Sequence, residues 1–291
     1  MHVQLNIRSQ RRLTVTLLCV VALLICASLA VQFAKHATGH DHMYGLVPLF
    51  YVDLESNIPT WYSSSALLLA SVLLSVVALA KYQSQEAFRR HWMCLAAIFA
   101  YLAVDEVAML HEYPIAPLRS ALNATGALHY TWVIPGFLAV AIVGVCYLKF
   151  LKHLPARTRN LFIVAGMTFV GGAIGLEMVS GIEASAHDES SINYMLIVTA
   201  EECMEMLGIV IFIHGISDYI LRNINSISIQ IGEAVSSSPS PIEITAVDEG
   251  DVENVTLHQC TELADQVGLQ AAEYRQTPSN ETAESSVADE G

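Results

Sequence analysis

The sequence predicts an all-α, polytopic membrane protein: a six-helix transmembrane bundle followed by a disordered acidic cytoplasmic tail. Of its 291 residues, 54% are hydrophobic and only 14% are charged, against roughly 25% charged in soluble domains. Six apolar stretches are long enough to cross a bilayer, which takes about 20 residues of helix. The hydropathy then collapses after residue 223. These three observations favour a membrane body with a polar extension.

The first apolar run, Leu13–Ala34, follows a basic N-terminal segment, residues 1–12. Ser28–Ala30 offers the small-residue pattern of a signal-peptide cleavage site. The run is nevertheless longer than the usual signal core of about 7–15 residues. We therefore predict a retained first span preceded by a short cytoplasmic segment.

The remaining spans are predicted in the same way, from apolar stretches long enough to cross a bilayer. Trp61 and Tyr62 suit the aromatic belt at the start of the second span. Residues 113–130 form a turn-rich connector with one short helix. Gly171 and Gly175 form a small-xxx-small pair, which permits close helix approach. The membrane domain covers residues 13–222, and its later spans are predicted at about 63–82, 92–111, 131–151, 161–182 and 194–221.

Basic residues predict the orientation, because they accumulate on the cytoplasmic side of membrane proteins. The opposite side offers only Lys35 and Arg119. Both termini are therefore expected to be cytoplasmic, in a plasma (inner) membrane. The residues that gather on the predicted cytoplasmic side are Arg8, Arg11, Arg12, Lys81, Arg89, Arg90, Lys149, Lys152, Arg157, Arg159 and Arg222.

The tail, residues 223–291, contains thirteen Asp or Glu and one Arg. Such a segment buries too little apolar surface to fold, so we expect it to be largely disordered. Residues 251–275 have helical spacing, either as a docking element for a cytoplasmic partner or as a nascent helix. An acidic surface offers no basis for nucleic-acid binding.

Ionisable side chains interrupt three of the spans, and no Lys or Arg inside a span is available to balance them. Such groups cost from about 2.5 to more than 10 kcal/mol in a bilayer, so they mark a site by default. The polar loop with Asp53 and Glu55 is expected to cap that site. The candidates for a metal or proton site are Asp105, Glu106, Glu177, Glu201, Glu202 and Glu205, with Tyr101, His111, Glu112, His129 and His187 in supporting positions.

Helix geometry predicts that these acids meet. At about 1.5 Å per residue, Asp105 lies roughly 20 Å and Glu177 roughly 24 Å above the cytoplasmic start of its span. Glu201 and Glu205 lie roughly 10 and 16 Å below the outer end of theirs. All then lie in the outer half of the bilayer. His111 points away from the acidic stripe on an ideal helix, although helix ends bend.

Carboxylates crowded at low dielectric need protons or a countercharge. A divalent ion held by carboxylate and imidazole, such as Zn, Fe or Mn, would supply it. Shared protons, a cation passing as cargo, and simple interhelical hydrogen bonds are the alternatives.

Three functions follow from this site. The first is a metal-dependent membrane hydrolase, although no HExxH motif is present. The second is a proton- or cation-coupled transporter that uses the same acids, although the two halves show no internal repeat. The third is an ion-responsive sensor or scaffold that signals through its tail. The expected partners are membrane lipids and a second copy in a homodimer, and no residue pattern assigns a catalytic residue.

Overall fold

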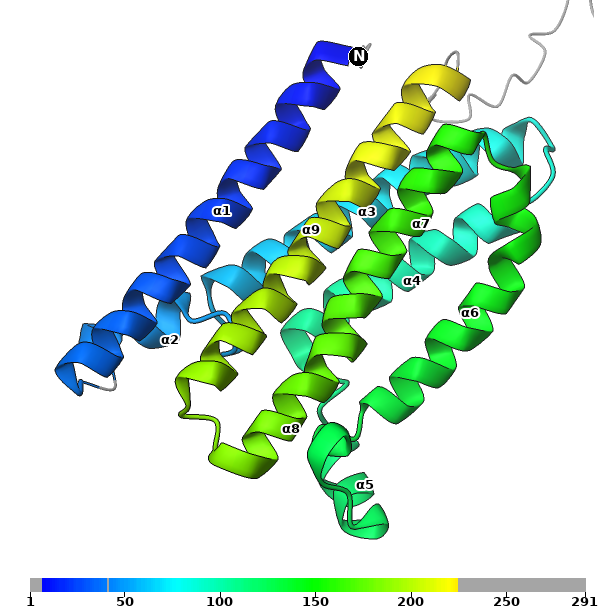
Figure 1. The fold of residues 1–291 in the computed structure, drawn as a ribbon. Coiled ribbons are helices and arrows are strands. Elements are labelled where there is room, and N and C mark those ends of the chain that lie inside the picture. Colours follow the sequence, from blue (N-terminus) through cyan, green and yellow to red (C-terminus); the bar gives the residue numbers. More distant parts are fainter. Residues whose placement is uncertain (1–6, 41, 225–291) are drawn as a thin grey trace, which may run out of the picture. The chain divides into compact units, whose positions relative to one another are not determined.

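The computed structural model describes residues 7–40 and 42–224, and this part of the chain folds into helices joined by short turns (Figure 1). The tail was predicted from residue 223, but Asn223 ends the last helix, and residues 225–291, with the predicted helical spacing at 251–275, lie outside the described residues. The prediction of an all-helical chain is confirmed for the part that is described.

Five helices are long and apolar enough to cross a membrane by length and composition. They coincide with the first five predicted spans. The fifth is one continuous helical stretch, in which a π-helical turn separates two α-helical segments. These elements are α1 (Ile7–Thr38), α3 (Ile58–Gln83), α4 (Arg89–Ala108), α6 (Val133–His153), and the combined stretch of α7 (Ala156–Val170), η3 (Gly171–Leu176) and α8 (Glu177–His187).

The sixth predicted span forms the helix α9 (Ile192–Asn223). It is not among the five candidates by length and composition, so its passage through the membrane stays a prediction. The remaining elements are short and connect the long helices: η1 (Met43–Gly45), α2 (Leu46–Phe50), α5 (Ile115–Leu122) and η2 (Gly126–Leu128). The helix α5 is the one expected in the connector before α6.

Helix α9 is the central element of the bundle. It packs against α1, α3, α7, η3 and α8, and more than half of its residues are buried. Figure 1 shows α9 between α1 and α7. The backbone of α6 approaches α7 and η3, and its Tyr147 and Phe150 side chains pack against His91 and Trp92 of α4, but most of its residues are exposed. Groups on α9 are therefore surrounded by protein, whereas α6 lies at the edge.

Helices α3 and α4 form a tightly packed hairpin. Serine side chains of α3 donate hydrogen bonds to carbonyl oxygens of α4: Ser64 to Ala103 at 2.7 Å and Ser71 to Ala96 at 2.8 Å. Small hydroxyl side chains satisfy their polar groups in this way inside an apolar environment. The hairpin fixes the end of α4 relative to the loop that precedes α3.

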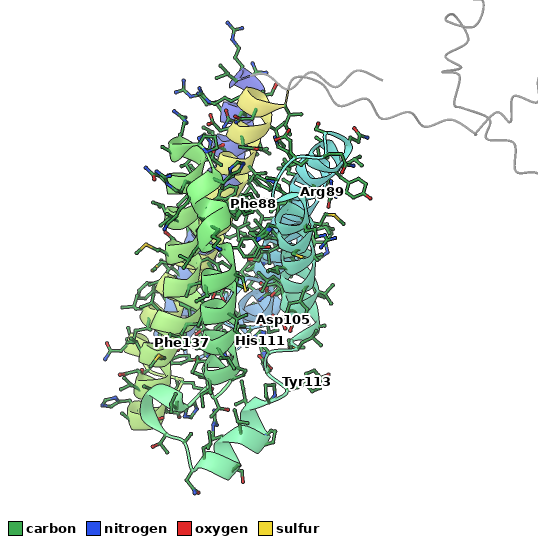
Figure 2. The ribbon with its side chains drawn as sticks, turned by 90° about the vertical axis from the view of Figure 1, so that its right-hand side faces the viewer. Phe88, Arg89, Asp105, His111, Tyr113 and Phe137 are labelled. Carbon is green, nitrogen blue, oxygen red and sulfur yellow. The ribbon has the colours of Figure 1, made fainter. Side chains whose placement is uncertain are left out.

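The two ends of the bundle carry different charges. At one end, buried Asp218 pairs with Arg157 and Arg222, with Nε–Oδ distances of 3.0 Å. Figure 2 shows Arg89 at this end of α4 and Asp105 and His111 toward the other. We call the second end, where α4 and α8 end and α9 begins, the acidic end.

Candidate functional site

The end of α4 determines where His111 lies. The helix stops at Ala108, three residues before the predicted end of the span, because Met109 adopts a left-handed conformation (φ 52°). The Met109 N–H caps the Asp105 carbonyl at 2.7 Å. The chain then turns back over the last turn of the helix. His111 is thereby returned to the acidic side, which an ideal helix would not have allowed.

Asp105 holds His111 at two points. The backbone N–H of His111 donates to Oδ1 at 2.9 Å, and its Nδ1 lies 3.0 Å from Oδ2. A carboxylate only accepts hydrogen bonds, so Nδ1 carries the hydrogen. The lone pair is then on Nε2, which is the arrangement that carboxylate–histidine pairs impose on metal ligands.

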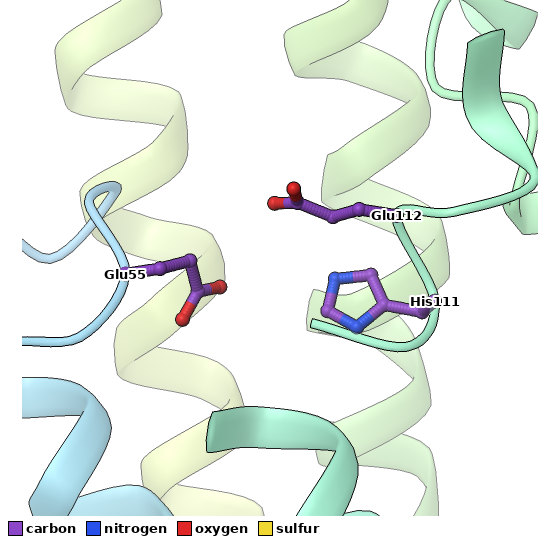
Figure 3. Close-up of side chains that lie close together, drawn as sticks. All are labelled: Glu55, His111 and Glu112. Atoms are coloured by element: carbon purple, nitrogen blue, oxygen red, sulfur yellow. The ribbon is translucent and has the colours of Figure 1, made fainter. Parts of the chain in front are cut away.

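Glu55, His111 and Glu112 converge at the acidic end. One ligand atom from each residue lies within 4.8 Å of the others. Figure 3 shows Glu55 reaching from the loop before α3 toward His111 and Glu112, which come from the turn after α4. Two carboxylates and one imidazole form a ligand set that suits Zn, Fe or Mn.

The first turn of α3 positions Glu55. Asn57 caps this helix by accepting the Thr60 N–H at 3.1 Å. Side-chain oxygens of Asn, Ser, Thr and Asp are the usual N-caps. The Thr60 hydroxyl donates to Glu55 Oε2 at 3.3 Å. The sequence placed this loop over the site but did not include Glu55 among the candidates, because a loop residue follows no helical periodicity.

A hydrogen-bonded chain ties the same loop to α9. The Tyr194 hydroxyl donates to Asp53 Oδ1 at 3.1 Å, and it lies 2.9 Å from the Tyr130 hydroxyl. Tyr130 in turn donates to Glu189 at 3.0 Å. Burial raises the pKa of Asp53 to about 6, although the hydrogen bonds from Tyr194 and Tyr51 act in the opposite direction.

The ligand group titrates in a partly desolvated environment. Burial raises the pKa of Glu55, with nearby Glu112 adding to the effect and His111 opposing it. Burial alone would lower the pKa of His111, but the hydrogen bond and charge of Asp105 outweigh it, so the net direction is upward. A bound cation would have to compete with a proton at His111.

The acids of the bundle lie beneath this group. Glu202 and Glu205 of α9 interact electrostatically with each other, with Glu106 of α4 and with Glu55. Glu106 in turn interacts with Glu55, His111 and Asp105. The structure thus places acids of α4 and α9 in one region that continues inward from the ligand group.

Trp132 connects His111 with the acid of α8. Its ring centroid lies 5.0 Å from that of His111, and its Nε1–H donates to Glu177 Oε1 at 2.7 Å. Glu177 is hydrogen-bonded to Glu201 of α9. Trp132 was not among the predicted residues, because a tryptophan at the start of a span also fits the interfacial belt.

Three supporting residues lie elsewhere. Tyr101 is exposed, with 56% of its surface accessible. His129 Nδ1 lies 3.0 Å from the Ser185 hydroxyl, and His187 pairs with Glu183 at 3.4 Å. None of the three belongs to the group that converges on His111.

Comparison with known proteins gives a family but no described activity. No curated protein and no solved structure matches the chain. A family model described as a domain of unknown function (DUF8692) matches residues 10–219, which is most of the chain. The chain therefore belongs to this family.

Proposed function

We propose that the protein is an integral membrane protein that binds a divalent transition-metal ion through Glu55, His111 and Glu112. The observation that supports this most is the convergence of the three ligand atoms within 4.8 Å. The contact of Asp105 with His111 Nδ1 adds to it, since this contact leaves Nε2 free for a metal.

Metal-dependent hydrolysis is the activity that this ligand set favours. Three protein ligands leave a coordination position for water, as in catalytic zinc sites. A metal ion held by Glu55, His111 and Glu112 would lower the pKa of a water molecule toward about 7, which is the chemistry that supplies a nucleophile at neutral pH. Glu106, which interacts with both Glu55 and His111, would accept the proton as general base.

Cation transport is the second candidate. The observation in its favour is the continuation of carboxylates from Glu55 to Glu106, Glu202 and Glu205, deeper in the bundle. Intramembrane acids of this kind line cation and proton pathways in transporters.

Metal binding can be measured through Trp132, one of three tryptophans in the chain. Because its ring lies 5.0 Å from that of His111, Co²⁺ bound at the site should quench its fluorescence. We expect Co²⁺ to quench the fluorescence of the wild type in a saturable manner. The part of the quenching that comes from Trp132 should be absent in Trp132→Phe. Asp105→Asn should weaken binding by about 10–100-fold, the usual cost of losing the partner of a ligating histidine.

His111→Ala and Glu112→Gln should weaken binding at least as much as Asp105→Asn. His36→Ala, an exposed histidine at the end of α1, is the matched control and should bind Co²⁺ like the wild type. Equal Zn²⁺ content in the wild type and His111→Ala, measured on purified protein, would refute the proposed site.

Reconstituted vesicles then distinguish the two activities. A hydrolase should cleave ester or amide substrates presented in the outer leaflet and stop when Zn²⁺ is removed. A transporter should accumulate Zn²⁺ inside the vesicles, and Glu202→Gln should abolish the uptake while binding at the ligand group persists.

A further inference from the structure

Glu177 and Glu201 form a carboxyl pair inside the bundle. The two side chains, from α8 and α9, are hydrogen-bonded to each other. Glu201 is buried, with only 6% of its surface accessible, and its Oε2 receives no hydrogen bond from any donor of the described residues. Trp132 donates to Glu177 Oε1 from the other side. Glu201 is therefore enclosed and Glu177 half-buried, and Trp132 is the donor that the described residues supply to their carboxyl groups.

The charged groups of the described residues that interact with this pair are mainly acids. Glu202 and Glu205 share α9 with Glu201, and Asp53 approaches from the loop before α3. His129 interacts with Glu177 as well, but burial and the neighbouring Arg119 lower its pKa, which favours the neutral ring. A buried carboxylate without a countercharge is strongly disfavoured.

The hydrogen bond between Glu177 and Glu201 requires a hydrogen on one of the two carboxyl groups. Two ionised carboxylates are acceptors only, so a bond between them requires a hydrogen on one of the oxygens. The indole N–H donates to Glu177 Oε1, whereas no donor of the described residues reaches Glu201 Oε2, so the hydrogen of the pair is assigned to Glu201. A single proton thus accounts both for the pair's hydrogen bond and for the lack of an external donor at Glu201 Oε2.

We infer that Glu177 and Glu201 hold one shared proton, and that a divalent cation bound by Glu55, His111 and Glu112 expels it to the solvent. The second half rests on the proposed function, whereas the first does not. The result is an exchange of a cation for a proton at the acidic end of the bundle.

Trp132 is the contact through which the two sites interact. Its indole ring makes an edge-type contact with the ring of His111, at an interplanar angle of 60°, and its N–H donates to Glu177. A divalent charge at His111 favours the ionised form of carboxyl groups close to it, because opposite charges attract strongly where water is excluded. Loss of the shared proton therefore offsets one of the two positive charges that the cation brings.

The presence of the shared proton can be tested on metal-free protein. Infrared spectra of the metal-free protein at neutral pH should contain the C=O band of a protonated carboxyl group, and Glu201→Gln should remove it. Glu183→Gln, a carboxyl that binds Ser191 and His187 at the rim, is the control and should leave the band unchanged. An unchanged band in Glu201→Gln would overturn the inference.

The exchange is tested by calorimetry of Zn²⁺ binding in buffers of different ionisation enthalpy, which counts the protons released. The wild type should release more protons per Zn²⁺ than Glu201→Gln, by up to one, because His111 contributes equally in both. An equal count would overturn the exchange and leave metal binding intact. Absence of Zn²⁺ binding would instead refute the proposed function and the exchange, while the infrared result would still stand for the shared proton.

Discussion

Asp53, a single carboxyl group in the loop before α3, makes the stability of the folded protein depend on pH. Its pKa is raised from 3.8 to about 6, chiefly by burial. The folded state therefore binds this proton more tightly than the unfolded state. The resulting stabilisation is complete below pH 3.8 and is lost as the pH rises through about 6.

Asp53→Asn should therefore be more stable than the wild type at neutral pH. At about 1.36 kcal/mol per pKa unit, the gain is at most about 3 kcal/mol. The difference in unfolding temperature between variant and wild type should grow from acidic to neutral pH. Asp188→Asn, at an exposed position between α8 and α9, is the control and should show no such growth. A difference that is constant with pH would contradict the raised pKa.

At the same scale, the ligand group shows which residues the sequence could reveal. Asp105 and Glu106 stood out because ionisable groups are costly in an apolar span. The position of His111 depends on the left-handed conformation of Met109, which helical periodicity cannot predict. Glu55 depended on the cap at Asn57 and on the packing of α3 against α4.

At the scale of elements, the π-helical turn η3 changes which glycine meets α9. The sequence suggested the Gly171–Gly175 pair from its four-residue spacing. A π-helical turn bonds residues five apart, so it rotates the following face relative to an α-helix. A Cβ at Gly171 would lie 3.0 Å from the end of the flexible Met204 side chain, and one at Gly172 would lie 2.8 Å from the Glu201 carbonyl oxygen. A Cβ at Gly175 would meet nothing within 4 Å, so Gly172 takes the place of Gly175 in the close contact with α9.

Gly172→Ala should consequently destabilise the protein by about 1–3 kcal/mol, the usual cost of overpacking. It should also disturb the Glu177–Glu201 pair, because it forces η3 away from α9. Gly175→Ala, from the same turn, is the matched control and should unfold at or above the wild-type temperature. Thermal unfolding of purified protein measures both, and equal stability of the two variants would contradict the close contact at Gly172.

At the scale of the whole molecule, apolar length predicted the long helices well, because the cost of burying polar groups in lipid dominates their composition. Helix α9 is different, since its acids face neighbouring helices rather than lipid and lower its apolar content. Composition alone therefore does not assign it to the membrane. The basic residues predict that it crosses and ends on the cytoplasmic side.

Labelling with a membrane-impermeant maleimide tests this topology in a cysteine-free background. A cysteine at Asn123, between α5 and η2, should react from outside intact cells. Cysteines at Ser84 and Asn223 should react only after the membrane is opened, because both are predicted to be cytoplasmic. Reaction of Asn223→Cys in intact cells would show that α9 does not cross.

The tight α3–α4 hairpin has a consequence for biogenesis. All three ligand residues and Asp105 lie between positions 55 and 112, and the hairpin fixes the loops that carry them. The ribosome delivers this stretch before α6–α9 exist, so the ligands are complete early in membrane insertion. The proton pair and Trp132 arrive later, with the second half of the chain. Under the proposed function, cation loading during synthesis would therefore precede the coupling of the cation to protons.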